Sequence, residues 1–236
     1  MQQNTKRKLL VPIVSAGLLL AGAQAMASTI TLTFGSESNQ AQIENYFNGG
    51  TDSLGKSGPN AGIAFSVNAE SLKAGVTGAA GTGTGKFENL PSGAPGVLYF
   101  AAVPTGTTSV MNMAAGFSSL SFNYSLLNNL ASEASTVQLW SGLNGTGTEL
   151  GTLSLTSSGT PTACTNSKDE FCSWSNASSA NFGVAESAVF TGDAAVFSEF
   201  DSIKVSPVPL PGALLLLVSG MGGLAGFVRR RNVVAA

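Results

Sequence analysis

The chain has 236 residues, among them 29 glycines, two cysteines and no histidine. Only 10% of the residues are charged, but 43% are hydrophobic and 13 are phenylalanine, which supplies enough apolar side chain for a packed core and excludes disorder over most of the chain. The absence of histidine excludes Ser-His-Asp and Cys-His catalytic sites and histidine-ligated metals.

The net charge of −2 is unevenly distributed along the chain. Six of the 11 basic residues lie near the two ends, at 6–8 and 229–231, so the region between them has five basic residues against 13 acidic ones, a net charge of −8 (5 − 13). An acidic body repels phosphate backbones, and we therefore expect no nucleic-acid partner.

The N-terminal segment, residues 1–27, has the pattern of an export signal. Lys6–Lys8 precede an apolar run, and the run ends in the small residues Ala25, Ala27 and Ser28. We expect the export translocase to take up this segment and signal peptidase to cleave after Ala27, with cleavage after Ala25 as the alternative. An uncleaved anchor is the competing interpretation, but the apolar run is short for a membrane span.

Residues 28–207 read as one all-β ectodomain, because no change in composition separates two domains. Apolar residues alternate with polar ones in several runs, the pattern of strands with one buried face: Ile30, Leu32 and Phe34; Ile63, Phe65 and Val67; Leu120, Phe122 and Tyr124; Ile203 and Val205. The run at 97–103 is more continuous and suggests a central strand. Short helices are considered at 40–47 and 126–134.

The clearest hairpin surrounds Asn144-Gly145, a turn signal between two apolar runs at 137–140 and 150–155. Together these patterns predict an antiparallel β-sandwich with a jelly-roll-like arrangement, preceded by a signal-peptide helix and followed by a transmembrane helix.

Four oxygen-bearing side chains suggest a structural Ca²⁺, the one cofactor for which the sequence offers candidate ligands. Glu44, Asn48 and Asp52 lie in or near a glycine-rich loop, and Asp201 opens the last strand. Hard oxygen ligands on loops suit this ion. The alternative is that these residues only form turns, as Asn and Asp often do.

Exposed aromatic side chains on loops would provide a platform for sugar rings. Tyr46 and Trp174 are the preferred candidates for such a carbohydrate contact, and Phe47 and Trp140 are further ones. Trp140 lies in a predicted strand, so core packing is its better interpretation.

Cys164 and Cys172 flank a polar segment and are predicted to form a disulfide. Two cysteines without histidine provide too few ligands for a structural zinc site, and their spacing differs from the C-x-x-C redox motif. A disulfide that closes a short loop fits an exported protein.

The C-terminal segment, residues 208–231, has three parts and is followed by the short tail 232–236. It begins with the processing motif Val208-Pro209-Leu210-Pro211, continues through residues 212–228 without a charge, and ends in the stop-transfer residues Arg229, Arg230 and Arg231. As a helix the uncharged run would span about 25 Å, just short of the hydrocarbon core of a bilayer. The prolines mark its start, and the arginines favour the cytoplasmic side and stop further export. A plain membrane anchor and a buried core helix are the alternatives.

This tripartite tail resembles a PEP-CTERM sorting signal, although Leu210 stands where glutamate is commonest in the family. The resemblance implies recognition by an exosortase-type membrane peptidase and an association with extracellular polysaccharide and biofilm. The stretches 44–66, 139–155 and 200–205 are similar to the β-sandwich ectodomain of many exported PEP-CTERM proteins, whose layout is similar to that of lectin-like and carbohydrate-binding jelly rolls.

Three functions follow as hypotheses. The first is a non-enzymatic surface or extracellular-matrix protein that passes through an inner-membrane intermediate with its ectodomain outside. The second is a carbohydrate-binding module that ties polysaccharide to the envelope, and the third, weaker one is a glycoside-active enzyme, which needs only two carboxylates. We expect no catalytic residues.

Overall fold

The computed structural model describes residues 28–74, 85–100, 108–126, 135–156, 164–165, 171–191 and 198–208. The predicted signal segment, the tail beyond Val208 and the helix considered at 126–134, apart from Leu126, lie outside these residues. In the part of the chain that the structure describes, no helix is long and apolar enough to cross a membrane.

Several residues of the predicted targeting segments therefore stay predictions, because they lie outside the described ranges. In the signal segment these are Ala25 and Ala27, while Ser28 is described and exposed. In the C-terminal segment only Val208 is described, and the residues outside are Pro209, Leu210, Pro211, Arg229, Arg230 and Arg231. The two terminal helices expected from the sequence fall in the same category.

Strands account for the regular structure of the described residues, apart from one short 3-10 turn, η1 (Leu143–Gly145). The strands are β1 (Ile30–Leu32), β2 (Ala41–Gln42), β3 (Ala64–Phe65), β4 (Ala69–Lys73), β5 (Gly96–Phe100), β6 (Ser109–Leu126), β7 (Ser135–Trp140), β8 (Glu149–Leu155), β9 (Ser175–Thr191) and β10 (Ser198–Pro207).

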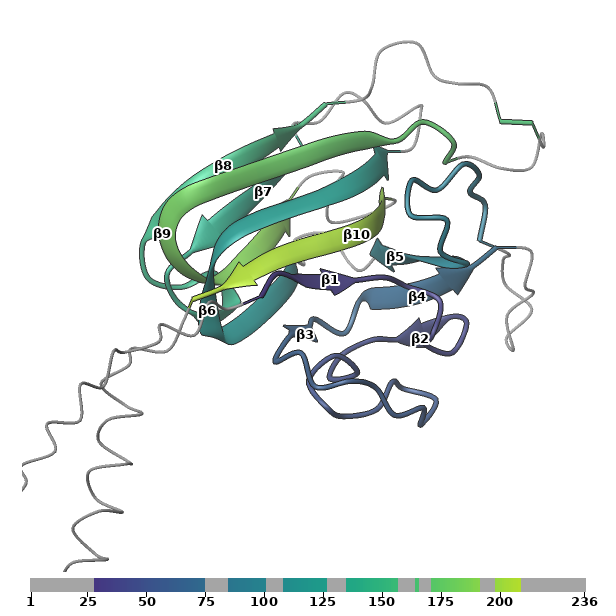
Figure 1. Cartoon of the computed structure of the whole chain (residues 1–236), viewed down its shortest axis with the longest axis horizontal. Coiled ribbons are helices and arrows are strands. Elements are labelled where there is room, and N and C mark those ends of the chain that lie inside the picture. Colours follow the sequence, from purple (N-terminus) through teal and green to yellow (C-terminus); the bar gives the residue numbers. More distant parts are fainter. Residues whose placement is uncertain are drawn as a thin grey trace, which may run out of the picture. The chain divides into compact units, whose positions relative to one another are not determined.

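Every pair of these strands is antiparallel, as the sequence predicted. The strand order is β2-β4-β5-β10-β6-β9-β7-β8, with β1 paired to β10 and β3 paired to β6. The last strand, β10, therefore lies in the middle of the sheet, between β6 and the pair β5 and β1 (Figure 1).

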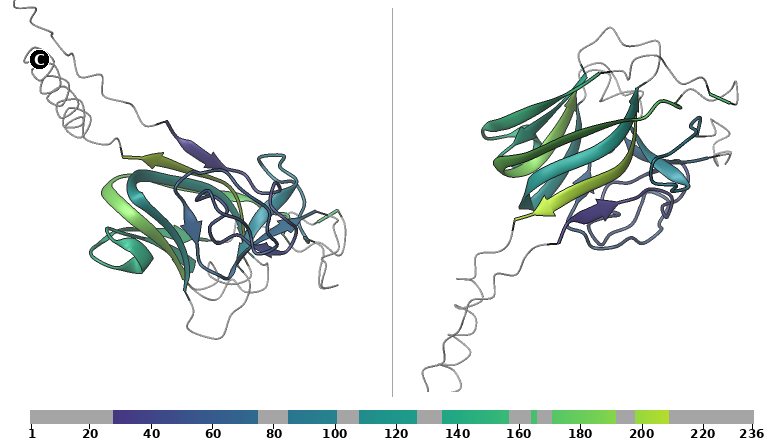
Figure 2. Two further views of the ribbon diagram at one scale, coloured as in Figure 1. Left: turned by 90° about the horizontal axis from the view of Figure 1, so that it is seen from below. Right: turned by 45° about the horizontal axis from the view of Figure 1, so that its top comes forward.

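The two longest strands, β6 and β9, bend together at one corner of the sheet (Figure 2). Asn112 pairs with Ser187 and the next pair is Phe117 with Ala185, so residues 113–116 of β6 lie opposite a single residue of β9. A matching irregularity follows in β9, where residues 181–184 lie opposite Ser118 alone. Such bulges bend a strand and allow the sheet to fold over its own core.

The folded sheet encloses one main hydrophobic core, as in a β-sandwich. Its largest fully buried side chains are phenylalanines, which make edge or tilted ring contacts that stabilise aromatic pairs: Phe34, Phe100, Phe117, Phe122, Phe190 and Phe200. Of these rings, Phe34 and Phe122 belong to the alternating runs expected from the sequence. The expected run of Ile63, Phe65 and Val67 was wrong at its end, because Val67 is 60% exposed after the short strand β3.

A second, smaller cluster covers the opposite face of the central strands. It contains Phe87, Val97 and Phe171, and the half-buried Leu72, Leu90 and Trp174 pack against it. Val97 and Leu98 are neighbours in β5, but Leu98 belongs to the main core, so β5 is buried on both faces. This explains why residues 97–100, the described part of the run at 97–103, lack alternation.

The Asn144-Gly145 hairpin is confirmed. The Thr146 N–H donates to the Leu143 carbonyl, and both central residues have positive φ, 57° for Asn144 and 70° for Gly145. Asparagine and glycine are the residues that tolerate this conformation best. The helix considered at 40–47 was wrong: β2 and a series of turns occupy this segment.

Candidate functional site

The first and last strands of the body lie side by side, so the described body begins and ends at the same place. Ile30 pairs with Val205 and Leu32 with Ile203, and the Thr29 and Ser206 hydroxyl oxygens are 3.3 Å apart. Val208, the first residue of the predicted processing motif, donates its N–H to the Gly116 carbonyl at the bent corner of β6. Contacts to the rest of the body therefore continue along the chain as far as Val208.

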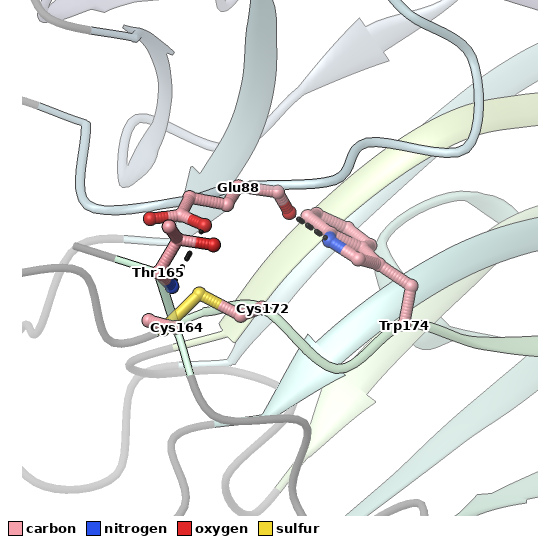
Figure 3. The surroundings of a disulfide bond; sticks show 5 residues. All are labelled: Glu88, Cys164, Thr165, Cys172 and Trp174. Carbon is pink, nitrogen blue, oxygen red and sulfur yellow. Dashed lines mark hydrogen bonds between the residues drawn. A yellow bond between two sulfur atoms is a disulfide. The ribbon is translucent and has the colours of Figure 1, made fainter.

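Cys164 and Cys172 form the predicted disulfide, with their Cα atoms 5.5 Å apart. Figure 3 shows Glu88 beside it, in contact with both neighbouring segments. The Thr165 N–H donates to Glu88 Oε2 at 3.0 Å, and Trp174 Nε1–H donates to the Glu88 carbonyl oxygen at 2.8 Å. Glu88 thus links the residue after Cys164 to Trp174, which follows Cys172, through its side chain and its carbonyl group.

Trp174 does not present the free ring that the sequence suggested. Its side chain is half-buried against the cluster of Phe87 and Phe171, and its only ring donor is bonded to Glu88. Trp174 therefore packs as part of the small cluster. Its partial burial costs little free energy, because the indole N–H keeps a hydrogen-bond partner.

Tyr46 and Phe47 are not exposed either. Tyr46 is 3% exposed and its ring stacks edge-on against Phe47, which packs in turn on Phe34. Burial raises the pKa of the Tyr46 phenol, and the carboxylates of Glu37 and Asp52 raise it further. Trp140 lies in β7, as expected, but it is only half-buried and belongs to neither hydrophobic cluster, so its interpretation as a core residue was wrong.

Asp52 organises the loop in which calcium was predicted. Its Oδ1 accepts the N–H groups of Leu54 and Lys56, and its Oδ2 accepts that of Ser38. Desolvation opposes ionisation of Asp52, but these hydrogen bonds outweigh it and lower the pKa of the carboxyl group. Both oxygens therefore have backbone partners.

Asp201 lies elsewhere and has its own partner. It is fully buried in β10 and accepts two hydrogen bonds from Ser92, in the loop that precedes β5. Glu44 is half-buried with its carbonyl bonded to Phe65, and Asn48 is exposed and bridged to Asn60. The four predicted ligands thus have separate structural roles, and the described residues contain no group of three or more acidic or cysteine side chains that could hold a metal ion.

Glu37 is a buried carboxyl group that the sequence pattern did not reveal. It is fully buried beside β4, where Oε2 accepts the Gly35 N–H at 2.7 Å while Oε1 has no hydrogen-bond partner. Burial raises the pKa of Glu37 above its usual value, despite the opposing effects of the Gly35 hydrogen bond and of Lys73. No local signal marks this residue, which sits in an ordinary turn sequence.

The strand register brings a row of polar side chains together on the face opposite the phenylalanine core. Tyr99 lies between Glu70 on β4 and Glu199 on β10, and Glu199 in turn pairs with Ser125 on β6. Directly paired residues share a face, so Glu70 and Glu199 stand two strands apart, about 9.6 Å between Cα atoms. Desolvation raises the pKa of Glu70.

No family model and no curated protein matches this chain. Among solved structures, the K2 cleaved adhesin domain of Lys-gingipain is similar over 75% of this chain and 99% of its own length, with 10% identity and a TM-score of 0.44. The K1 cleaved adhesin domain of Lys-gingipain from Porphyromonas gingivalis W83 is similar over 77% and 99%, with 12% identity and a TM-score of 0.37.

A third similar structure is the catalytic domain of a GH87 alpha-1,3-glucanase in complex with tetrasaccharides. It has 12% identity and a TM-score of 0.34, and the match covers 64% of this chain but only 27% of the glucanase. Likenesses at this level carry no argument about activity, and the function has to be argued from the chain itself.

Proposed function

We propose that the chain is an exported, non-enzymatic protein of the cell surface or extracellular matrix, whose body is a jelly-roll-like β-sandwich and whose C-terminal segment is a sorting signal. The observation that carries the proposal is the agreement between the limits of the fold and the limits of the two targeting segments. β1 begins at Ile30, two positions after Ser28, and β10 ends at Pro207, immediately before the processing motif.

Removal of both segments would take away no strand of the described body. Cleavage after Ala27 leaves the pairing of Ile30 with Val205 intact, and cleavage beyond Val208 leaves its hydrogen bond to Gly116 intact. A described body whose first and last strands pair with each other supports the interpretation of the tail as a removable address, because removal of the tail would break none of these strand pairs.

The disulfide supports the proposed location outside the cytoplasm. Disulfides persist in the periplasm and in extracellular space, and they are rare in reducing cytosol. The bond between Cys164 and Cys172 lies beside Glu88 and Trp174, next to the small hydrophobic cluster on which Trp174 packs (Figure 3).

The test is the fate of the full chain in a host that has an exosortase-type system. Variants in which Pro209 and Pro211 are replaced by alanine should remain in the inner membrane with the tail attached. Replacement of the three arginines at 229–231 by serine should weaken retention, because each arginine opposes passage through the bilayer centre by about 2.5–3.5 kcal/mol on insertion scales. Substitution of Lys204, an exposed charge on β10, by serine is the matched control. Unchanged fractionation of both tail variants would contradict the proposal.

A second candidate function, binding of a neutral polysaccharide, is favoured by the polar row around Tyr99. In this row the Tyr99 ring and the Glu70 carboxylate are half-buried and can contact a sugar, whereas Glu199 and Ser125 are fully buried beneath them in the sheet and can only support that contact. Retardation in polysaccharide-containing gels should then be lost in Tyr99→Ala and kept in Trp140→Phe. Equal migration with and without polysaccharide would leave the surface-protein proposal without this activity.

A further inference from the structure

A pocket in the described body is explained by neither the targeting segments nor the polar row. It has a volume of about 340 Å³ and lies between β1 and the loop of residues 46–61. Four consecutive residues of the chain, 30–33, line one side of it, and Tyr46, Phe47, Pro59 and Ala61 line the other side, with Ser36 between them.

The pocket runs along the edge of β1. Successive side chains of a strand point to opposite faces, so a pocket that touches Ile30, Thr31, Leu32 and Thr33 in turn cannot lie on either face alone. It must lie beside the strand, where the main chain of an edge strand displays N–H and C=O groups. We call this space the β1 slot, lined by residues 30–33, 36, 46, 47, 59 and 61.

The edge of β1 lacks the cover that the edges of β2 and β3 have. Among the described strands β1 pairs only with β10, and no backbone hydrogen bond joins its residues to the loop 46–61 across the slot. By contrast, the outer edge of β2 is occupied by Ser53, which accepts from the Gln42 N–H and donates to the Gln42 carbonyl. The edge of β3 is occupied by Glu44, whose carbonyl accepts the Phe65 N–H.

The edge also lacks the usual devices against strand pairing. Natural proteins protect open edges with lysine, proline, bulges or inward charges. The segment 28–34 contains neither a charged residue nor a proline, and Thr31 and Thr33 are β-branched residues with exposed side chains. All of the residues that line the slot are uncharged at neutral pH.

We propose that the β1 slot binds an extended, uncharged segment of another polypeptide, which adds to β1 as a new strand. Four residues of β-strand span about 13 Å, and main-chain hydrogen bonds to the edge would provide affinity while alternate side chains contact the apolar wall. This inference is independent of the proposed function.

Two other occupants fit less well. A second copy of this chain would have to pair its β1 with this β1, but in each copy the loop 46–61 stands beside the edge and blocks such pairing. The net charge of −8 between the basic ends also makes two bodies repel each other. A sugar chain would need an open aromatic ring, but Tyr46 and Phe47 are 3% and 5% exposed.

The test uses the full-length protein and a blocked pentapeptide of alternating threonine and valine, with the same peptide carrying a central proline as control. Isothermal titration should give saturable one-to-one binding that is at least about tenfold tighter for the alternating peptide, since proline cannot donate to the edge. Amide exchange of Ile30–Thr33 should slow when the peptide is bound.

Two variants locate the binding site. Thr31→Glu places a charge in the uncharged slot, and Ala61→Trp fills it from the opposite wall; each should weaken binding at least about tenfold. Ser154→Glu, at an exposed position on the distant edge strand β8, is the matched control and should leave binding unchanged. Thr31 is exposed, so its variant keeps the test valid if Ala61→Trp impairs folding.

Absence of saturable binding, or equal binding of the two peptides, would overturn the proposal. Binding of maltohexaose that is lost in Thr31→Glu would identify the slot as a sugar site and would also overturn it. A concentration-dependent dimer that Thr31→Glu abolishes would show that a second copy occupies the edge, which contradicts the proposal as well.

Discussion

Ser92 donates two hydrogen bonds to Asp201, from its N–H to Oδ2 at 2.9 Å and from its hydroxyl to Oδ1 at 2.7 Å. The contact joins positions 109 residues apart and fastens the loop before β5 to the last strand. Because Asp201 is fully buried, these hydrogen bonds satisfy a charge that would otherwise be costly to bury.

Replacement of Asp201 by alanine should lower the free energy of unfolding by about 2 kcal/mol, since hydrogen bonds to charged groups contribute about 1.5–3 kcal/mol. Ser92→Ala keeps the backbone hydrogen bond and should cost about 1 kcal/mol. Urea unfolding measures both, with Glu149→Ala on the exposed start of β8 as a control that costs about 0.5 kcal/mol or less. Equal effects of Asp201→Ala and Glu149→Ala would show that the contact contributes nothing.

Loss of the disulfide should destabilise the body by about 2.5 kcal/mol in the chain-entropy description of a loop of this length. The two cysteines are eight positions apart, which places the bond at the modest end of disulfide contributions. The double variant Cys164→Ser/Cys172→Ser should unfold at lower urea, and reductant should move the wild type to the same midpoint without affecting the variant. Quantitative thiol labelling of exported protein without reductant would contradict the bond.

Glu37 should make the body less stable as the pH rises from about 4.5 towards neutrality. Its pKa is raised by burial, so the folded state holds the proton more tightly than the unfolded state. The resulting stability is complete below the unfolded pKa and is lost as the pH passes through the folded one. Glu37→Gln should flatten this part of the pH dependence of Tm. The control is Glu149→Gln, a substitution of an exposed glutamate, which should leave the pH dependence unchanged. A parallel slope in wild type and Glu37→Gln would exclude Glu37 as its source.

The loop 46–61 should tolerate alanine at Gly55 far better than at Gly58. A Cβ at Gly58 would lie 2.2 Å from the Tyr46 carbonyl oxygen, while one at Gly55 has nothing within 4 Å and meets only the positive φ of 87°. We expect a cost of about 3 kcal/mol for Gly58→Ala and about 1 kcal/mol for Gly55→Ala in chemical unfolding. Similar costs would mean that the loop moves freely away from Tyr46.

The strands were predictable where one face is buried and the other exposed. Ile30, Leu32 and Phe34, or Leu120, Phe122 and Tyr124, alternate with polar residues, and the structure buries the apolar set except for the half-buried Ile30. The Asn144-Gly145 turn was predictable because its conformation needs those residue types. The disulfide was predictable because the chain has only two cysteines, Cys164 and Cys172, which can form a single intramolecular pair.

The site residues were harder to place because their environment comes from distant segments. Tyr46 lies within a turn that precedes two glycines, a context in which either exposure or burial is sterically allowed. Its ring contact with Phe47, which packs in turn on Phe34, decides the outcome. Asp201 and Glu37 appear as ordinary polar residues until Ser92 and Gly35 are seen beside them. The second cluster on the outer face, which buries Val97 and half-buries Trp174, has no periodic signature either.

The central claim is that the described body is what remains after processing at both ends, and intact mass spectrometry of the exported protein tests it most directly. The protein should be recovered from the surface or medium of a host with an exosortase-type peptidase and, in parallel, from the same host without that peptidase. The account predicts a mature chain that begins at Ser28 and ends within residues 208–211 in the first host, and one that extends to Ala236 in the second. A chain that keeps Arg229, Arg230 and Arg231 in both hosts would contradict the account and identify the C-terminal segment as an ordinary anchor.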